Sequence, residues 1–480
     1  MVNNYLVYIF TGGFAMFKKK RALTAAVLLS CSFFMAPYYA HAEEEEPSCD
    51  HPSYYMQVTA DSLTYQFDLY DATNHSGPHW RGEYTTDDNG QKIKEYATYR
   101  DLFTGEKQAF GDSIAYIHNL INPSGTTNPT IKLELLPDKD ANAAAQSDTY
   151  ITFKDDGTPV QISDTELAAV LQGKYHPEDN DIVAEIEVDL APPDTIWYID
   201  KFPVLPSNGT DSDYYGTITH EMFHALGLGT YISEDKNSGK VTFGTSGNYY
   251  DNDYYRSMAV FNKYEMGIRD VFKRPVYYSV AYDQNLGSTT YTVYDDNPIN
   301  PNDENDWSRI SGELTSRTIV PITLDEFKSE DFEIKPDEFY VLRGDDVGTN
   351  SGAYFTGANV VEVLTTKNAA TGKDELANIA WPDDADAPAV QGLPLNGYED
   401  SEGTVPELSH IELQNVNMSH QNYRNWCSFT EAELALMQDL GYNIDRGAYF
   451  GKSIYNSGTV DEDENINYFT YDNNNAFNST

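Results

Sequence analysis

Basic residues are scarce in this chain. Of its 480 residues, 31 are lysine or arginine and 76 are aspartate or glutamate, which gives a formal net charge of −45. Binding to nucleic acid requires local lysine and arginine side chains that displace counterions from phosphates, and no such basic stripe is present, so we expect no nucleic-acid partner. A hydrophobic fraction of 40%, with 13% aromatic residues, excludes a wholly disordered acidic chain. The length allows two or three domains and a sizeable core.

Long apolar runs are absent after residue 42, so we expect no transmembrane segment in the mature chain. Residues 1–42 have the pattern of a secretory signal peptide: the basic residues 18–21, an apolar run at 22–36, and an A-x-A site that predicts cleavage after Ala42. Residues 28–31 loosely resemble a lipoprotein box, which is the alternative. The sequence therefore predicts a secreted protein or one associated with the cell surface.

Cysteine is nearly absent as well. Only three are present, and only Cys49 and Cys427 follow the predicted cleavage site. In an oxidising compartment this pair can form a disulfide between the mature N-terminus and the C-terminal third. Two unpaired thiols are the alternative, and the sequence does not decide between them.

The part of the chain from 43 to 230 is predicted to mix helices and strands. Residues 104–121 have apolar side chains at helical spacing, and residues 130–136 alternate apolar and polar side chains as a half-buried strand does. A helix is expected to begin at Asp211 or Ser212 and to extend to Leu228, because these polar residues can cap a helix and glycines follow its end.

The composition changes after residue 230. Residues 231–409 are rich in tyrosine, asparagine, aspartate and glycine, and we interpret them as a large irregular or β-rich insertion in which 257–272 is expected to be helical. Residues 410–450 are predicted to form a C-terminal subdomain with a helix at 428–441, and 451–480 form a polar tail.

One motif carries chemistry. His220, Glu221 and His224 match H-E-x-x-H. Residues four apart share one helical face, so both imidazoles can reach one zinc ion, and Glu221 then lies beside the open coordination position. There it can act as the general base for a zinc-activated water. The alternative is an ordinary pair of histidines on a helix. Because catalytic zinc usually has three protein ligands, a third is required.

The motif resembles that of the metzincin metallopeptidases, H-E-x-x-H-x-x-G-x-x-H. Gly227 matches, but Thr230 stands where the compact motif has its third histidine. The chain is similar to the leishmanolysin-like branch, in which an insertion precedes the third histidine and a methionine turn. His410, Met418 and the stretch 429–442 follow in that order. The resemblance implies an α+β zincin fold with a mixed sheet and an active-site helix, with His220, His224 and His410 as zinc ligands and Met418 beneath the metal.

Other residues compete for these roles. His420, Glu431 and Glu433 are alternative third ligands, although both glutamates fit the solvated face of a helix better. By analogy with astacin-like enzymes Tyr423 is a candidate for stabilising the oxyanion, but its spacing from Met418 differs from the spacing there. The loops rich in aspartate and asparagine are candidates for structural Ca²⁺, with solvated acidic loops as the alternative.

These observations lead to one hypothesis and one rival. The first is a secreted, zinc-dependent endopeptidase that acts on protein or peptide substrates with Glu221 as general base. The rival is a non-hydrolytic adhesin or acidic interaction module that keeps a zincin scaffold, supported by the insertion and by a tail similar to the start of a bacterial autotransporter passenger. Cleavage of casein that is lost in Glu221→Ala, with zinc still bound, would distinguish them.

Overall fold

The computed structural model is a mixed α+β protein with several sheets and few helices among the residues that it describes. This agrees with the α+β class expected from the sequence. The described residues are 54–70, 79–86, 92–97, 102–136, 143–154, 157–178, 181–189, 197, 199, 213–235, 238–246, 258–285, 287–343, 350–367, 370–376, 390–397, 405–412, 416–419 and 429–446. The predicted signal peptide, the polar tail, Cys49, Cys427, His420 and Tyr423 lie outside them.

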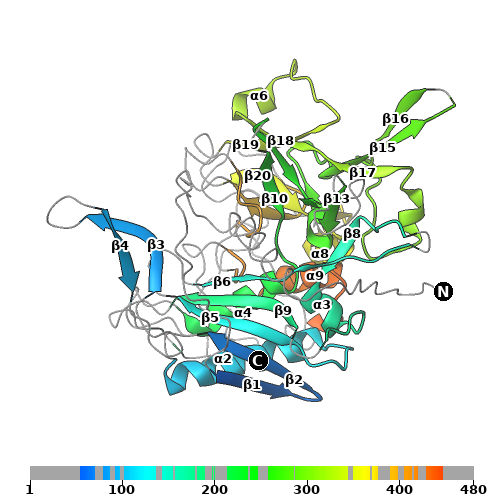
Figure 1. Cartoon of the computed structure of the whole chain (residues 1–480). Coiled ribbons are helices and arrows are strands. Elements are labelled where there is room, and N and C mark those ends of the chain that lie inside the picture. Colours follow the sequence, from blue (N-terminus) through cyan, green and yellow to red (C-terminus); the bar gives the residue numbers. More distant parts are fainter. Residues whose placement is uncertain are drawn as a thin grey trace.

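A five-stranded mixed sheet forms one end of the molecule (Figure 1). The middle strands are parallel to one another, whereas the strand at each edge is antiparallel to its neighbour. In spatial order the strands are β1 (Tyr54–Ala60), β2 (Leu63–Tyr70), β5 (Thr130–Leu136), β9 (Ile182–Asp189) and β6 (Ala143–Gln146). The short strand β6 is therefore an edge strand with one neighbour in the described sheet.

Apolar and polar side chains alternate along β5, so the two faces of this sheet differ in burial. Ile131, Leu133 and Leu135 are almost fully buried, while Lys132 and Glu134 between them point to the other face and are half-buried. The buried side chains share one hydrophobic core with helices α2 (Thr104–Ile121) and α4 (Tyr214–Ala225), which contact each other. The predictions of a helix at 104–121 and a strand at 130–136 are both confirmed.

Helix α4 is the predicted H-E-x-x-H helix, with different ends. Its N-cap is Asp213, whose carboxylate accepts the backbone N–H of Gly216 at 3.1 Å, rather than Asp211 or Ser212. The helix ends at Ala225, because Gly227 takes a φ of +108° and turns the chain. The prediction that the helix continues to Leu228 is wrong by three residues.

The regular elements of the segment 231–409 are mostly short strands in its described part. They form a four-stranded sheet of β10, β11, β18 and β19, three-stranded sheets β14–β20–β23 and β16–β15–β17, and the pair β21–β22, while β12 and β13 join β8 and β7. The bounds are β7 (Thr149–Tyr150), β8 (Ile162–Thr165), β10 (Ile232–Asp235), β11 (Lys240–Phe243), β12 (Thr245–Ser246), β13 (Ala259–Asn262), β14 (Ile268–Arg269), β15 (Tyr277–Asp283), β16 (Ser288–Thr292), β17 (Glu313–Ser316), β18 (Thr318–Ile322), β19 (Glu338–Leu342), β20 (Asn350–Phe355), β21 (Thr365–Lys367), β22 (Asp374–Leu376) and β23 (Leu393–Asn396).

The smaller elements complete the described chain. A separate hairpin pairs β3 with β4. The short helices lie mostly between the strands of 231–409, as Figure 1 shows. The bounds are β3 (His79–Thr86), β4 (Lys92–Ala97), α3 (Glu166–Leu171), α5 (Lys263–Gly267), η3 (Asp306–Arg309), α6 (Leu324–Lys328) and α8 (Ala358–Leu364).

The prediction of a single long helix at 257–272 is wrong. The structure has strand β13, the one-turn helix α5 and strand β14 there. Asn262 and Glu265 form a capping box that begins α5, and Ile268 then pairs with Phe355 of β20. Tertiary pairing therefore overrides the helical spacing of the apolar residues.

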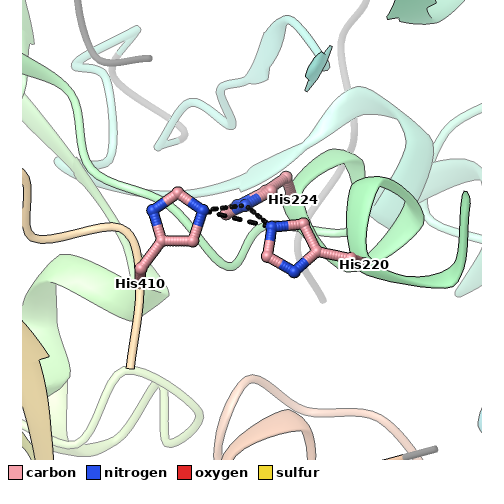
Figure 2. A group of neighbouring side chains, drawn as sticks. All are labelled: His220, His224 and His410. Carbon is pink, nitrogen blue, oxygen red and sulfur yellow. Dashed lines mark hydrogen bonds between the residues drawn. The ribbon is translucent and has the colours of Figure 1, made fainter. Parts of the chain in front are cut away.

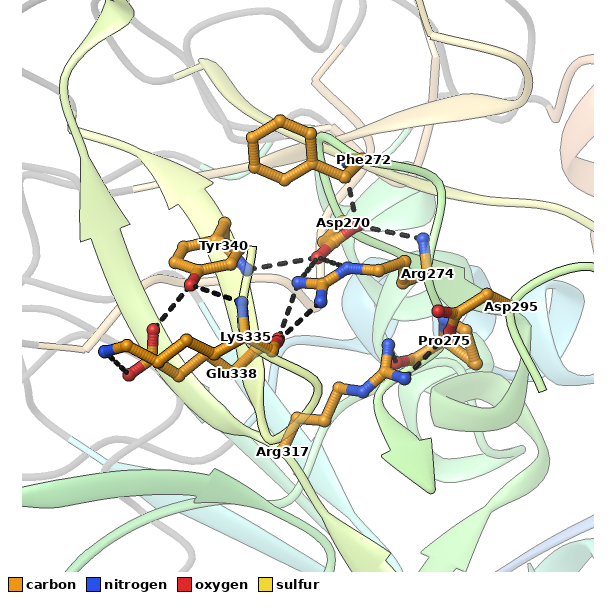
Figure 3. Close-up of polar contacts among 9 residues, drawn as sticks. All are labelled: Asp270, Phe272, Arg274, Pro275, Asp295, Arg317, Lys335, Glu338 and Tyr340. Carbon is orange, nitrogen blue, oxygen red and sulfur yellow. Dashed lines mark hydrogen bonds and ion pairs between the residues drawn. The ribbon is translucent and has the colours of Figure 1, made fainter. Parts of the chain in front are cut away.

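A buried polar network joins the strands of this segment (Figure 3). Asp270, which has no exposed surface, accepts the backbone N–H groups of Phe272, Arg274 and Tyr340 and pairs with the Arg274 guanidinium at 2.6 Å. Arg317 is also fully buried and contacts Asp295 at 2.7 Å. Since a buried charge is costly without a partner, these pairs fix how the loop after β14 packs on β19.

The C-terminal helix α9 (Glu431–Asp439) packs against α8, and the residue before its cap contacts α4. Thr430 and Glu433 form its capping box, and Phe429 just before it stacks on Phe223 of α4 with ring centroids 3.7 Å apart. The expected helix at 428–441 is confirmed with shorter ends. One core cluster contains residues of the five-stranded sheet, of the 231–409 segment and of α9. In the described part of the chain, no helix combines the length and apolar character needed to cross a bilayer.

Candidate metal centre

Three imidazole rings meet between α4 and a loop that follows the 231–409 segment. His220 and His224 lie on one face of α4, with their Nε2 atoms 3.0 Å apart. The Nε2 atom of His410 lies 3.1 Å from that of His220 and 3.3 Å from that of His224. Figure 2 shows His410 approaching the helical pair from a separate strand of chain. Residues 186 and 190 positions apart in the sequence are thus brought together.

This arrangement fits a divalent metal ion. Ligand atoms bound tetrahedrally at about 2.0–2.1 Å lie about 3.3 Å from one another, close to the separations of the three nitrogens. A single proton can bridge only one pair of them, whereas a cation placed among them satisfies all three lone pairs. Within the described residues these histidines form one of two groups whose donor atoms all lie within 4.8 Å of one another.

Each ring has an oxygen atom within 2.8 Å of its Nδ1. Nδ1 of His220 donates to the carbonyl oxygen of Asn417 at 2.6 Å, and Nδ1 of His224 donates to that of Leu228 at 2.6 Å. Nδ1 of His410 lies 2.8 Å from the carboxylate of Glu407. With the proton held on Nδ1, the Nε2 lone pair of each ring is left to face the other two rings.

The end of α4 places the acceptor for His224. The backbone N–H of Leu228 bonds to the carbonyl of Phe223 and that of Gly227 to the carbonyl of His224, at 3.0 and 2.9 Å. This is a Schellman motif, which requires the positive φ that Gly227 adopts. The turn brings the Leu228 carbonyl back over the last turn of the helix, where it meets His224.

The turn at Met418 connects two of the ligands. Asn417, whose carbonyl accepts from His220, also donates through its side chain to Thr219 at 3.0 Å. The carbonyl of the fully buried Met418 accepts the N–H of Ile411, the residue after His410, at 2.7 Å. The methionine turn expected from the resemblance thus supports His220 on one side and the His410 strand on the other.

Thr230 stands where the compact motif has its third histidine, and it contacts Ser409, the residue before His410. Its N–H donates to the Ser409 hydroxyl at 3.1 Å, and the two hydroxyl oxygens lie 3.0 Å apart. Position 230 therefore positions the His410 segment and supplies no imidazole of its own.

Glu221 lies in the same helical turn as the two ligands and is only 5% exposed. It is close enough to Glu187 of β9 for its charge to act on that group. Burial, together with the charges of neighbouring carboxylates, raises the pKa of Glu187 to about 8. Strand β9 therefore places a carboxyl group that tends to keep its proton near the base candidate.

The two glutamates considered as third ligands have other partners. Glu433 is fully buried and accepts the N–H groups of Met418 and Thr430 at 2.7 and 2.6 Å, so the expectation that it lies on a solvated face is wrong. Burial raises its pKa to about 7. Glu431 lies 3.7 Å from the Arg446 guanidinium. Neither belongs to a group of metal donors in the described part of the chain.

A second group of carboxylates lies on the outer face of the five-stranded sheet. It contains Glu134, Glu185 and Glu187, with ligand atoms within 4.8 Å of one another. Lys132 contacts both Glu134 and Glu185, so two of the three carboxylates are already paired with a cation. Within the described residues, the loops considered for calcium contain no further cluster of metal-donor atoms. Asp303 and Asp306 instead accept backbone N–H groups of their own loop.

The oxygen atoms behind the three imidazoles were not predicted from the sequence. Two of them are backbone carbonyls, which no residue type reveals. Glu407 had a usable signal, because a glutamate three residues before a proposed ligand, as in Glu407 and His410, can contact its imidazole. Thr430 and Glu433 also had one, since a threonine followed three residues later by glutamate is the capping-box pattern.

Comparison with protein-family models, with curated proteins and with solved structures finds no match for this chain.

Proposed function

We propose that this protein is a zinc-dependent endopeptidase of the metzincin type, similar in chain order to the leishmanolysin-like branch. One observation supports it above the others: the imidazoles of an H-E-x-x-H helix and of a histidine far along the chain converge through their Nε2 atoms, 3.0–3.3 Å apart. The mixed sheet next to this helix and the turn at Met418 are consistent with a zincin architecture.

His220, His224 and His410 would hold the metal. Three neutral imidazoles are a donor set typical of zinc sites that keep one position open. When bound, zinc would polarise the carbonyl of the scissile peptide bond and lower the pKa of a nearby water. The oxygen atoms behind the rings favour a proton on each Nδ1, which would leave each Nε2 lone pair for the metal.

Glu221 would act as general base and then as general acid. It follows His220 directly in α4 and its side chain is buried. Its carboxylate would accept the proton of the attacking water and afterwards transfer it to the leaving amine, as peptide hydrolysis requires. A buried carboxylate is suited to taking up and releasing a proton, because the low dielectric around it makes its pKa sensitive to nearby charges.

The substrate would bind as an extended strand along β6. Among the described strands β6 is at the edge of the five-stranded sheet, and it contacts α4, the helix that carries His220 and His224. Its four residues are all half-buried, which leaves backbone groups within reach of an added strand. The acidic surface of the chain would favour basic peptides through long-range steering.

We further propose secretion or attachment at the cell surface, on the strength of the signal-peptide pattern in residues 1–42. The protein and its peptide substrates would then meet outside the cytoplasm.

The test compares wild type with Glu221→Gln and with the exposed control Glu234→Gln. Wild type and the control should cleave casein and a broad library of fluorogenic peptides. Glu221→Gln should bind zinc stoichiometrically but lose about two to four orders of magnitude in kcat, the usual contribution of a general base. A wild type that binds zinc yet cleaves nothing in the library would refute the peptidase and favour the adhesin hypothesis. Equal activity of Glu221→Gln and wild type would refute the role of Glu221.

A further inference from the structure

The three candidate ligands differ in what lies behind them. His220 and His224 each donate to a neutral backbone carbonyl. His410 alone has a carboxylate there, with Oε2 of Glu407 at 2.8 Å from its Nδ1. A carboxylate behind an imidazole raises the basicity of the ring and binds its N–H more strongly than a carbonyl does.

Glu407 is surrounded by hydrogen-bond donors. The side chain is 8% exposed. Its Oε1 accepts the backbone N–H of Ser409 at 2.9 Å, and its Oε2 accepts the side-chain amide of Asn396 at 3.3 Å as well as facing His410. Two of these partners donate hydrogen bonds and the third faces it at ion-pair distance, which is the environment of an ionised carboxylate.

A buried carboxylate of this kind needs a compensating positive charge. In the described part of the chain Glu407 has one ion-pair partner, which is His410, and no lysine or arginine contacts it. A buried charge without a partner lowers the stability of the folded state by roughly several kcal/mol. A divalent cation among the three Nε2 atoms would supply the missing charge, one imidazole away.

The backbone holds Glu407 and His410 in register with each other. Strand β23 bonds to both ends of this segment: the N–H of Asn396 donates to the His410 carbonyl at 3.0 Å, and the N–H of Glu407 donates to the Gly397 carbonyl at 2.7 Å. The hydroxyl of Tyr264 donates to the Leu408 carbonyl between them at 2.9 Å. The pair is therefore preset by the 231–409 segment and does not depend on flexible side chains alone.

We propose that Glu407 is a positioning residue for the metal: it orients the His410 ring and supplies the buried negative charge that makes His410 a strong ligand. The inference rests on the metal site of the proposed function and is independent of whether the site cleaves peptides. It gives the 231–409 segment a specific task, because β23 and Tyr264 of that segment hold the carboxylate and its imidazole in place.

The test measures zinc affinity in the full chain by competition with a chromogenic chelator. Glu407→Gln keeps the size of the side chain and removes its charge, and it should weaken zinc binding about 10- to 100-fold. The matched control is Glu265→Gln, a fully buried glutamate that accepts the N–H groups of Tyr231, Gly244 and Asn262 in a capping box of α5. Its zinc affinity should stay within about threefold of wild type.

The visible absorption spectrum of the Co²⁺-loaded protein is the second readout. The spectrum should change in Glu407→Gln, because the donor strength of one ligand changes, and should stay as in wild type in Glu265→Gln. Glu407→Asp, which keeps the charge on a shorter side chain, should bind zinc more tightly than Glu407→Gln and at least about threefold more weakly than wild type. If Glu407→Gln does not fold, the comparison of Glu407→Asp with wild type decides.

Three outcomes overturn the proposal. The first is that both Glu407 variants have the zinc affinity and the Co²⁺ spectrum of wild type. The second is that Glu265→Gln weakens zinc binding as much as Glu407→Gln does, which would indicate a general loss of folding. A wild type that binds no zinc would refute both the metal site and this inference. A wild type that binds zinc tightly but cleaves no peptide refutes only the peptidase.

Discussion

The turn at the end of α4 gives a sharp prediction. Gly227 has a φ of +108°, which side chains other than glycine rarely adopt. A Cβ added there would meet only the Thr165 methyl group at 3.6 Å, an ordinary contact. The cost of Gly227→Ala therefore comes from the backbone conformation and not from a clash. We expect a loss of about 1 to 2 kcal/mol in the free energy of unfolding.

Gly229 is the matched control two residues further on. It does not have a positive φ, and its added Cβ would lie 3.9 Å from the Ser409 hydroxyl and 4.0 Å from Nδ1 of His224. Alanine fits there, so Gly229→Ala should be neutral or should stabilise by about 0.4 to 1 kcal/mol through the unfolded chain. Both glycines are in the same loop, which removes most differences of context.

The assay is urea denaturation of the metal-free protein, so that zinc affinity does not enter the comparison. Zinc affinity is then measured separately. It should fall in Gly227→Ala, because the Schellman motif positions the Leu228 carbonyl that accepts from His224 at 2.6 Å. A Gly227→Ala variant as stable as wild type, or a Gly229→Ala variant destabilised by the same amount, would refute the reasoning.

Three further predictions concern the same fold. Tyr442→Phe should lower the free energy of unfolding, measured in urea, by about 1 to 3 kcal/mol. The substitution removes the buried hydroxyl that donates to the Leu226 carbonyl at 2.7 Å in wild type. An unchanged urea midpoint would contradict this prediction. Burial raises the pKa of Glu187 from 4.5 to about 8, so the folded chain holds this proton more tightly than the unfolded chain, and the stabilisation is complete below about pH 4.5 and lost as the pH rises to about 8. Between pH 5.5 and 8.5 wild type should therefore lose at least about 1.4 kcal/mol more stability than Glu187→Gln, whereas parallel pH profiles would contradict the assignment. Removal of metal with a chelator should lower Tm, and free zinc at 100 times its Kd should restore about 2.7 kcal/mol in wild type but not in His220→Ala.

The local elements were predictable because their patterns are local. The helix at 104–121 and the strand at 130–136 follow from the spacing of buried residues such as Phe110 and Leu133, and both have the predicted bounds. The prediction of one helix at 257–272 was wrong because the spacing of its apolar residues suits a helix, whereas Ile268 pairs with Phe355 in a strand far along the chain. No local pattern contains that partner.

The candidate site divides in the same way. His220 and His224 follow from a five-residue motif, and His410 followed from the order of residues in a resembling family, not from spacing. The carbonyls of Asn417 and Leu228 could not be predicted, because an acceptor on the backbone has no residue signature and depends on the turn that presents it. Glu433 was misplaced because its helix was treated as an isolated amphipathic segment, whereas its cap is buried under the Met418 turn.

The most direct test of the central claim is zinc content and X-ray absorption at the zinc edge for wild type and His410→Ala. The account predicts one zinc per chain in wild type, with three imidazole nitrogens at about 2.0–2.1 Å, and loss of one imidazole with much weaker binding in the variant. Wild type without stoichiometric zinc, or a His410→Ala protein with the same affinity and the same coordination shell as wild type, would contradict it.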